Sequence, residues 1–200
     1  MKKLLLSLIA LTIATSVFAQ GTVLFANRIA GTGTTHVYGP DGLLIGTVGG
    51  MSASTTFAQL IGAPGTNAPE SSFLPSASPP TSFRTGAAAG NIVAGTATFN
   101  NIPPDAPVAT FEMVAWDNAS GLYPTWAQAS AAWAAGLIAA GHSAPFNLLN
   151  IGGQVNTPPP IVSSIPGEGV QSFMLSIPEP TTAALAGLGA GALLIFRRRK

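Results

Sequence analysis

The chain has 200 residues, of which 47% are hydrophobic and only 8% are charged, and its formal net charge is +1. A typical globular protein is about 25% charged, and this chain lacks the basic surface that would neutralise a phosphate backbone, so we expect no nucleic-acid partner. It contains no cysteine, which excludes a disulfide framework, a redox CxxC pair and a thiolate zinc site. Residues 20–176 hold six acids and two bases, whereas the other six bases lie at the two ends. This pattern indicates an acidic body between two basic, apolar ends.

Residues 1–19 have the pattern of a secretory signal peptide. Lys2 and Lys3 form a positive start, an apolar-rich run of 14 residues follows, and Ala19 ends a Val-Phe-Ala sequence with small residues where signal peptidase reads them. We expect cleavage between Ala19 and Gln20. A buried core helix or an uncleaved anchor is the alternative, although the run is short for a membrane span.

Residues 20–176 predict an all-β secreted body. Glycine, proline, threonine and serine recur along this part of the chain, with apolar, β-branched and aromatic clusters between them. Many short strands with regular turn signals are typical of a β-sandwich or a β-barrel, and we expect an antiparallel β-sandwich, Ig-like or jelly-roll-like. The predicted strands cover residues 22–27, 35–38, 43–48, 55–61, 82–85, 95–100, 108–116, 146–150 and 171–177.

Turn and loop signals separate these strands. Residues 38–42, Tyr-Gly-Pro-Asp-Gly, predict a tight turn, because proline and Asp-Gly favour its geometry. Residues 62–80 and 156–169 are rich in proline. The first predicts a long loop between paired strands, and the second predicts an extended crossing before the final strand.

An alanine-rich segment interrupts the strand pattern and predicts one short helix over residues 125–135. Thr125 can cap its start, and Gly136 can end it. Trp126 and Trp133 are seven residues apart and therefore fall on one face of the helix. We expect this helix to lie across one edge of the sandwich.

The three tryptophans, Trp116, Trp126 and Trp133, lie within 18 residues of one another. Sugars stack on exposed aromatic rings, so Trp116 is a candidate contact for a glycan. The favoured alternative is that the helix packs these rings onto the sheet, where each buries a large apolar area.

The residues that could carry catalysis lack the spacing of a known site. His36 and His142 are far apart in the sequence, and we expect the first in a strand and the second in a turn, each as an ordinary polar residue. Glu112 and Asp117 could serve as a glycosidase pair. Because residues five apart in a strand point to opposite faces about 17 Å apart, these two are predicted not to meet.

Calcium binding is a weaker expectation. Its candidate oxygen ligands are Asp41, Asp105, Asp117 and Asn118, and none of them belongs to a DxDxDG-type loop. We therefore expect no catalytic residue, no cofactor and no bound metal. A hydrolase with an unrecognised site stays the enzymatic alternative.

The C-terminal residues carry the most specific pattern. Pro178, Glu179 and Pro180 precede an uncharged run over residues 183–196, and four basic residues follow, namely Arg197, Arg198, Arg199 and Lys200. The run would span about 21 Å as a helix, against about 30 Å of hydrocarbon. The two threonines before it and snorkelling arginines extend it to a marginal transmembrane helix over 181–196. The basic cluster would then stay in the cytoplasm and the body outside.

Residues 177–200 resemble the PEP-CTERM sorting domain, because Pro-Glu-Pro, a short hydrophobic helix and a basic cluster follow one another in fixed order. The resemblance implies recognition by exosortase, an integral-membrane cysteine protease-like transpeptidase of Gram-negative bacteria. It implies that 178–180 form the recognition element and that 197–200 form the stop-transfer cluster. A rigid linker before a plain tail anchor is the alternative interpretation of the Pro-Glu-Pro sequence.

The two terminal signals together predict a non-catalytic exported protein of the cell surface or extracellular matrix. The precursor is expected in the inner membrane with its body in the periplasm, followed by delivery to the surface or the medium. Its expected partners are signal peptidase, an exosortase-like enzyme and the inner membrane. The resemblance also implies an association with extracellular polysaccharide and biofilm. A polysaccharide-binding module or adhesin is the alternative function, and a hydrolase is less favoured.

Overall fold

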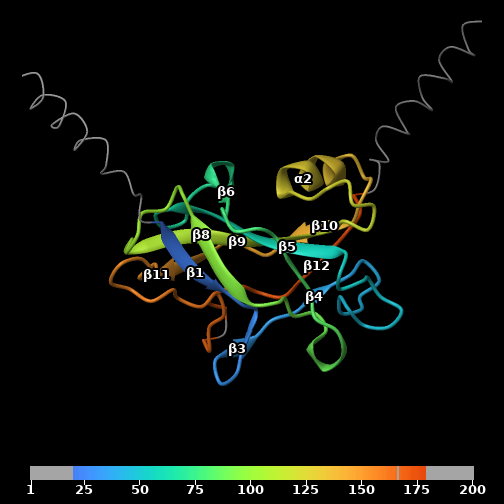
Figure 1. Ribbon diagram of the computed structural model, residues 1–200, viewed down its shortest axis with the longest axis horizontal. Helices are drawn as coiled ribbons and strands as arrows, with labels where there is room; N and C mark the ends of the chain where they lie inside the picture. The colour runs from blue at the N-terminus through green and yellow to red at the C-terminus, as the bar shows by residue number, and fades with distance from the viewer. Residues whose placement is uncertain (1–19, 166, 179–200) are drawn as a thin grey trace, which may run out of the picture.

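The computed structural model describes residues 20–165 and 167–178 of the chain (Figure 1). This part is mostly β-sheet with one short α-helix, which confirms the all-β prediction. Several predictions lie outside the described residues: the signal peptide with Ala19, the transmembrane helix, and the residues Glu179, Pro180, Arg197, Arg198, Arg199 and Lys200.

The described chain forms twelve strands, one α-helix and two short 3₁₀ turns. In chain order these elements are β1 (Gly21–Phe25), β2 (Arg28–Ile29), β3 (Gly33–Thr34), β4 (Val37–Tyr38), β5 (Thr56–Pro64), η1 (Glu70–Ser72), β6 (Leu74–Pro75), β7 (Thr81–Ser82), η2 (Gly86–Ala88), β8 (Gly95–Phe99), β9 (Val108–Asp117), α2 (Trp126–Ala134), β10 (Ala140–His142), β11 (Phe146–Leu149) and β12 (Phe173–Met174). Most predicted strands are therefore present, with ends that differ by a few residues.

Two long strands, β5 and β9, form the centre of a six-stranded antiparallel sheet. They pair over nine residues, from Thr56 opposite Asp117 to Pro64 opposite Ala109. The short strands β10 and β11 pair with the free edge of β9, and β6 and β7 pair with the free edge of β5. The sheet thus has β9 as a central strand, and eight of its ten residues are buried.

Both faces of this sheet are covered, because successive side chains of a strand point to opposite sides. Phe111 and Met113 of β9 join a core on one face, whereas Val114 and Trp116 join a second cluster on the other. Seven of the nine residues in Val-Ala-Thr-Phe-Glu-Met-Val-Ala-Trp are apolar, and such a nearly continuous apolar run is typical of a strand buried on both sides.

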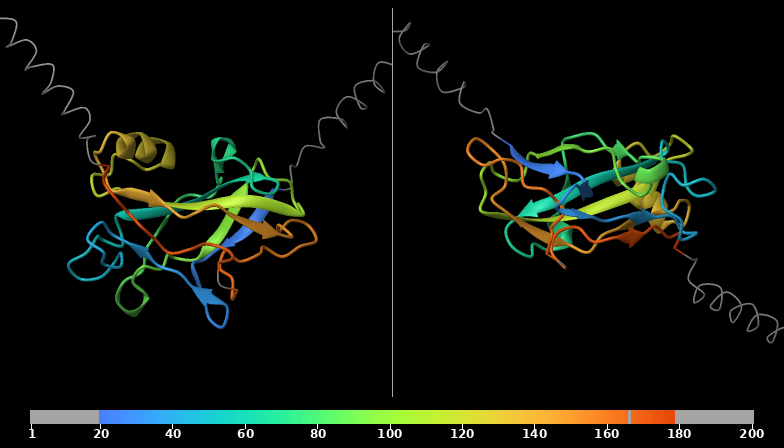
Figure 2. Two further views of the ribbon diagram at one scale, coloured as in Figure 1. Left: turned by 180° about the vertical axis from the view of Figure 1, so that it is seen from behind. Right: turned by 90° about the horizontal axis from the view of Figure 1, so that it is seen from below.

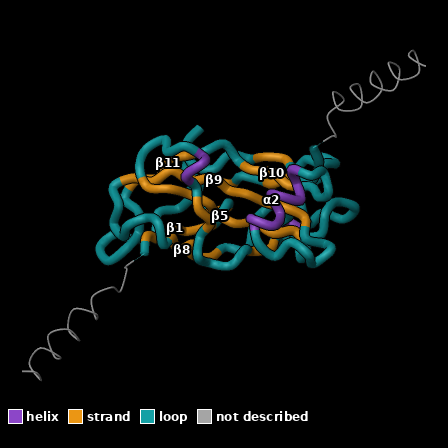
Figure 3. Tube along the Cα trace, turned by 90° about the horizontal axis from the view of Figure 1, so that it is seen from above, coloured by secondary structure: helices purple, strands orange, loops and turns teal. Residues whose placement is uncertain are grey.

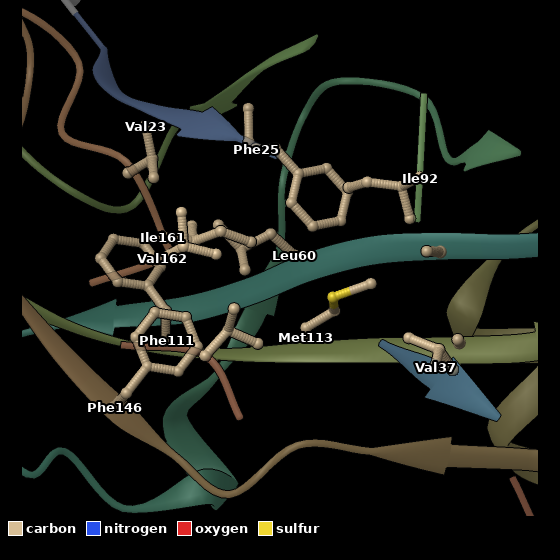
Figure 4. Packing of buried hydrophobic residues seen from close by; sticks show 14 of the residues in the cluster. Val23, Phe25, Val37, Leu60, Ile92, Phe111, Met113, Phe146, Ile161 and Val162 are labelled. Atoms are coloured by element: carbon tan, nitrogen blue, oxygen red, sulfur yellow. The ribbon is translucent and has the colours of Figure 1, made fainter. Parts of the chain in front are cut away.

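The larger core lies between the six-stranded sheet and a layer of shorter strands and loops. Val23 and Phe25 of β1 and Val37 of β4 lie in one buried cluster with Leu60, Phe111 and Met113 of the sheet (Figure 4). The ring of Phe99 in β8 meets that of Phe111 edge-on, with centroids 5.2 Å apart. This second layer contains the antiparallel pair β1–β8 and the parallel pair β4–β12, so the predicted purely antiparallel arrangement is wrong at β12.

Helix α2 covers the opposite face of the sheet (Figure 3). Its small residues Ala129 and Ala132 are buried against β9 and β10, so the helix backbone lies close to the sheet. Both predicted ends are confirmed: the Thr125 hydroxyl accepts a hydrogen bond from the Gln128 N–H, and Gly136 follows the helix with φ of 70°. The Gly136 N–H donates to the Trp133 carbonyl at 2.8 Å, which completes a glycine C-cap.

Four local predictions are wrong. His36 precedes strand β4 instead of lying in a strand. Residues 43–48 form turns rather than a strand, and within them Leu44 makes a single bridge to Tyr38. Residues 62–80 contain the end of β5, η1 and β6 rather than one loop. His142 ends strand β10 instead of lying in a turn. The tight turn over 38–42 is confirmed by the hydrogen bond from the Gly42 N–H to the Gly39 carbonyl at 3.0 Å.

The described chain begins and ends at opposite ends of the molecule (Figures 1 and 2). Gly21 opens β1, and its N–H donates to the Ile102 carbonyl at 2.9 Å. The other end of the chain leaves beside α2 and β10, as the bridge between Ser176 and Ala140 shows. This exit brings the last described residues next to the aromatic side chains of the helix.

Candidate functional site

A row of aromatic rings runs along the sheet face that α2 covers. Trp116 meets Trp126 with centroids 5.7 Å apart, Trp126 meets Trp133 at 6.3 Å, and Trp133 meets the imidazole of His142 edge-on at 5.9 Å. Helix spacing explains the order, since Trp126 and Trp133 share the face that packs on the sheet. The row therefore leads from the buried centre of the sheet to its exposed rim.

Trp116 is not available to a glycan in this structure. Its side chain is fully buried, with the ring of Phe57 edge-on at 6.1 Å, and its Nε1–H donates to the Tyr123 carbonyl at 2.8 Å. The candidate glycan contact is therefore corrected, and packing by the helix accounts for this residue. Trp126 and Trp133 are half-buried, so their outer edges stay accessible.

Glu112 and His142 form an ion pair at the outer end of the aromatic row. His142 Nδ1 lies 2.7 Å from Glu112 Oε1, and the glutamate side chain is 5% exposed while the histidine side chain is 41% exposed. The hydrogen bond to Glu112 raises the pKa of His142 against the opposing effect of burial. Sequence reasoning missed this pair, because three residues reading Ala-Gly-His carry no strand signal that would have placed β10 beside β9.

The ion pair has no nucleophile beside it among the described contacts. Ser143 follows His142, but its Oγ accepts the Met113 N–H at 3.1 Å and donates to the Ala144 carbonyl at 2.9 Å. The other two residues weighed for catalysis lie elsewhere: His36 lies beside Tyr38, and the Asp117 carboxylate accepts the Ala119 N–H at 2.8 Å. The arrangement does not form a Ser-His-Asp triad.

The candidate calcium ligands serve separate loops. The Asp105 carboxylate accepts hydrogen bonds from the backbone N–H groups of Asn156, Val155 and Gln154. These hydrogen bonds lower the pKa of Asp105, and the one from Asn156 has the largest effect. Asp41 accepts from the Leu43 N–H, and Asn118 accepts from the Tyr123 N–H. In residues 20–165 and 167–178 no three His, Asp or Glu side chains come close enough to hold a metal ion.

A surface depression of about 660 Å³ lies between β11 and the segment over 160–171. Phe146, Asn147 and Glu168 are among the residues that line it, and Glu168 is its one charged lining residue. None of His36, Glu112, Asp117 and His142 lines this depression, so it brings no candidate residue into a cleft.

The last described strand binds the chain firmly to the body. In β12 the Phe173 N–H donates to the His36 carbonyl at 3.2 Å, and directly after β12 the Leu175 N–H donates to the Tyr38 carbonyl at 2.8 Å. Leu175 is fully buried in the larger core. These contacts fix the position of the chain as far as Leu175.

Ser176 is held by both β10 and α2. Its backbone N–H donates to the Ala140 carbonyl at 2.9 Å, and its carbonyl accepts from the Ala140 N–H at 3.1 Å and from the indole N–H of Trp133 at 2.8 Å. Ile177 beyond it is 52% exposed. We call Phe173, Met174, Leu175 and Ser176 the exit strand.

Comparison with known families matches residues 176–200 to the PEP-CTERM protein-sorting motif. The chain carries a PEP-CTERM sorting motif. The motif shows that the chain is an exported protein whose precursor passes through a membrane stage and is processed by an exosortase-like enzyme. No curated protein and no solved structure matches the chain. Within residues 20–165 and 167–178, no helix is both long and apolar enough to cross a membrane.

The PEP-CTERM motif begins at the residue where the exit strand ends. Ser176 is the first matched residue and also the acceptor of the Trp133 indole hydrogen bond. Pro178 is half-buried, while Glu179 and Pro180 lie outside the described residues. The sorting motif therefore starts directly on the folded body, without an intervening linker.

Proposed function

We propose that the chain is a non-catalytic protein of the cell surface or extracellular matrix, with a folded β-rich body that an exosortase-like enzyme detaches from the inner membrane. The observation that carries this proposal is the PEP-CTERM match over residues 176–200, whose first residue, Ser176, is hydrogen-bonded to the body. The acidic body, with a net charge of −4 over residues 20–176, fits a soluble exported product better than a membrane-bound one.

The proposed precursor has a cleaved signal peptide at one end and a transmembrane helix at the other. The first strand supports cleavage between Ala19 and Gln20, because β1 starts at Gly21, directly after the expected cleavage point. The exit strand supports a tail that leaves from the opposite end of the molecule. A second layer of strands over the six-stranded sheet supports a sandwich-like body.

The proposed absence of catalysis rests on the geometry around the strongest titratable pair. Glu112 and His142 contact each other, yet the adjacent Ser143 hydroxyl is used by two backbone groups on the other side of the strand. A specific turnover activity in purified protein of residues 20–176 would contradict this part of the proposal.

Intact-mass and terminal-peptide analysis of the protein from cell fractions tests the sorting proposal. We expect a chain that starts at Gln20 and ends near 178–180, recovered outside the inner membrane. The variant Glu179→Ala should accumulate at full tail length in the membrane, whereas the matched control Glu168→Ala should be processed normally. A wild-type chain that retains residues 197–200 in the inner membrane would mean a plain tail anchor and would refute the proposal.

A polysaccharide-binding function is the second candidate, because Trp126, Trp133 and His142 present partly accessible rings side by side. Affinity electrophoresis against the host's own polysaccharide tests it. We expect the polysaccharide to slow the migration of wild type but not of Trp126→Ala. The control variant Leu149→Ala, which changes an exposed residue of β11, should be slowed as wild type is. Trp126 is preferable to Trp133 as the test position, since Trp133 also holds the exit strand. Equal migration of wild type with and without polysaccharide would remove this candidate.

A further inference from the structure

We propose that in the precursor the end of the body around Leu137 and Ile177 lies directly against the lipid surface of the membrane. We call this end, formed by the C-terminus of α2, the start of β10 and the exit of the chain, the exit face. The inference rests on the proposed function, because it requires residues 183–196 to insert in the bilayer. It adds a defined orientation of the body and a defined lipid-contacting surface.

The exit of the chain is fixed to this end of the body by several contacts. Ser176 is bridged to Ala140 and accepts the indole hydrogen bond of Trp133. Two residues further on, the Pro178 carbonyl oxygen lies so close to Gly136 that a Cβ added there would be 3.1 Å from it. Gly136 and Leu137 therefore lie beside the last described residue of the chain.

Little chain separates this point from the apolar run. Four residues, 179–182, connect Pro178 with the run that begins at Ala183. The five Cα–Cα steps from Pro178 to Ala183 reach about 17–18 Å when fully extended, because a residue spans at most about 3.3–3.6 Å. The headgroup layer on one side of a bilayer takes up about 5–8 Å of this. The exit face can therefore stand at most about 12 Å away from the lipid surface.

The side chains of the exit face suit an apolar contact. Leu137 is 68% exposed and Ile177 is 52% exposed, although both are large aliphatic residues. Arg28 and Arg84, the two basic residues of the body, line another depression together with Asn91. Neither arginine therefore attracts anionic lipid to this face, and the charge of His142 on β10 is offset by the Glu112 carboxylate 2.7 Å away. The short tether together with the two aliphatic side chains favours an uncharged lipid surface.

The opposite end of the body supplies an internal control. Val155 is 86% exposed, and its loop joins the first strand through the bridge between Gly152 and Thr22. Figure 1 places the start of β1 and the exit of the chain at opposite ends of the molecule. If the exit face meets the lipid, Val155 points away from it.

Site-specific labelling can test this orientation cleanly, because the chain has no cysteine. Full-length variants Leu137→Cys, Ile177→Cys and Val155→Cys would carry an environment-sensitive fluorophore and be reconstituted in phosphatidylcholine vesicles with nitroxide-labelled headgroups. We expect a blue shift and loss of most of the emission at positions 137 and 177, and neither at 155. Equal quenching at all three positions, or none at 137 and 177, would overturn the proposal.

Two outcomes of a flotation experiment with the same vesicles distinguish a failure of this proposal from a failure of the proposed function. If the full-length chain fails to float with the vesicles, residues 183–196 do not anchor it, and both proposals fail. If it floats but positions 137 and 177 stay unquenched, the membrane orientation alone fails. A flexible ten-residue Gly-Ser linker inserted after Pro178 should reduce quenching at 137, and unchanged quenching would refute the argument from tether length.

Discussion

At the scale of single residues, the pair of Glu112 and His142 couples the stability of the body to pH. Hydrogen bonding to Glu112 raises the pKa of His142 above its ordinary value of 6.5. A group whose pKa is raised on folding stabilises the folded state fully below its unfolded pKa. The contribution is lost as the pH rises through the higher pKa of the folded state. The pair therefore favours folding most strongly in mildly acidic solution.

The variant His142→Gln tests this coupling. Glutamine can still donate a hydrogen bond to Glu112, but it cannot carry the positive charge. We expect its loss of stability relative to wild type to be larger at about pH 5.5 than at about pH 9. Urea unfolding at both pH values measures the two differences, and an NMR titration of the wild-type imidazole checks the pKa directly. A difference that does not change with pH would contradict the coupling.

Trp116→Phe tests the packing assigned to the central tryptophan. The substitution leaves a cavity under α2 and removes the donor to the Tyr123 carbonyl, so we expect a loss of about 2–4 kcal/mol. Trp126→Phe is the matched control, because that ring is half-buried and should lose less than about 1 kcal/mol. Chemical denaturation of the two variants provides the comparison. Equal losses of stability in the two variants would show that the cavity and the buried hydrogen bond at Trp116 do not determine the loss.

At the scale of elements, the sequence predicts those with strong local signals. The helix over 126–134 could be predicted because threonine, alanine and glycine mark its start, interior and end. Strands β5 and β9 could be predicted from long apolar runs. Strand β10 could not, because its three residues become a strand only by pairing with β9. The parallel pairing of β12 with β4 likewise depends on where the chain returns, which no local pattern encodes.

The end of α2 provides a prediction at this scale. Gly136 has φ of 70°, and a Cβ there would lie 3.1 Å from the Pro178 carbonyl oxygen. We expect Gly136→Ala to destabilise the body by about 1–2 kcal/mol through backbone strain and this contact. Gly121→Ala is the control, because Gly121 has a similar φ of 72° but a Cβ added there would meet nothing within 4 Å. In thermal unfolding we expect Gly136→Ala to have a lower midpoint than Gly121→Ala, and the reverse order would contradict a role for the Pro178 contact.

At the scale of the whole molecule, the sorting signal and the body join at one residue. The PEP-CTERM pattern could be predicted from the sequence because its order of Pro-Glu-Pro, apolar run and basic cluster is linear. The attachment of its first residue could not be predicted, since Ser176 meets Ala140 and Trp133 only in the folded chain. The contact of Glu112 with His142 could not be predicted for a similar reason, because it depends on the pairing of β10 with β9. The burial of Trp116 under the helix agrees with the favoured alternative for the tryptophans.

This junction limits where processing can leave an intact product. A chain ending at Gln171 would lose the side chain of Leu175, which is fully buried. It would also lose the hydrogen bonds that the Phe173 and Leu175 N–H groups donate to the carbonyls of His36 and Tyr38. Burial of a leucine contributes about 2–3 kcal/mol and each hydrogen bond about 1 kcal/mol. The total is a large part of the 5–15 kcal/mol that stabilises a typical domain.

We therefore expect the body ending at Gln171 to unfold at a much lower urea concentration than the body ending at Pro178. A body ending at Ser176 should unfold at nearly the same urea concentration as the body ending at Pro178. Parallel denaturation of the three purified chains, each starting at Gln20, measures the difference. Equal midpoints for all three would show that the exit strand is dispensable. A large drop between the chains ending at Pro178 and Ser176 would instead place the structural boundary inside the sorting motif. The predicted order means that cleavage after Ser176 preserves the folded body, and that cleavage before Phe173 does not.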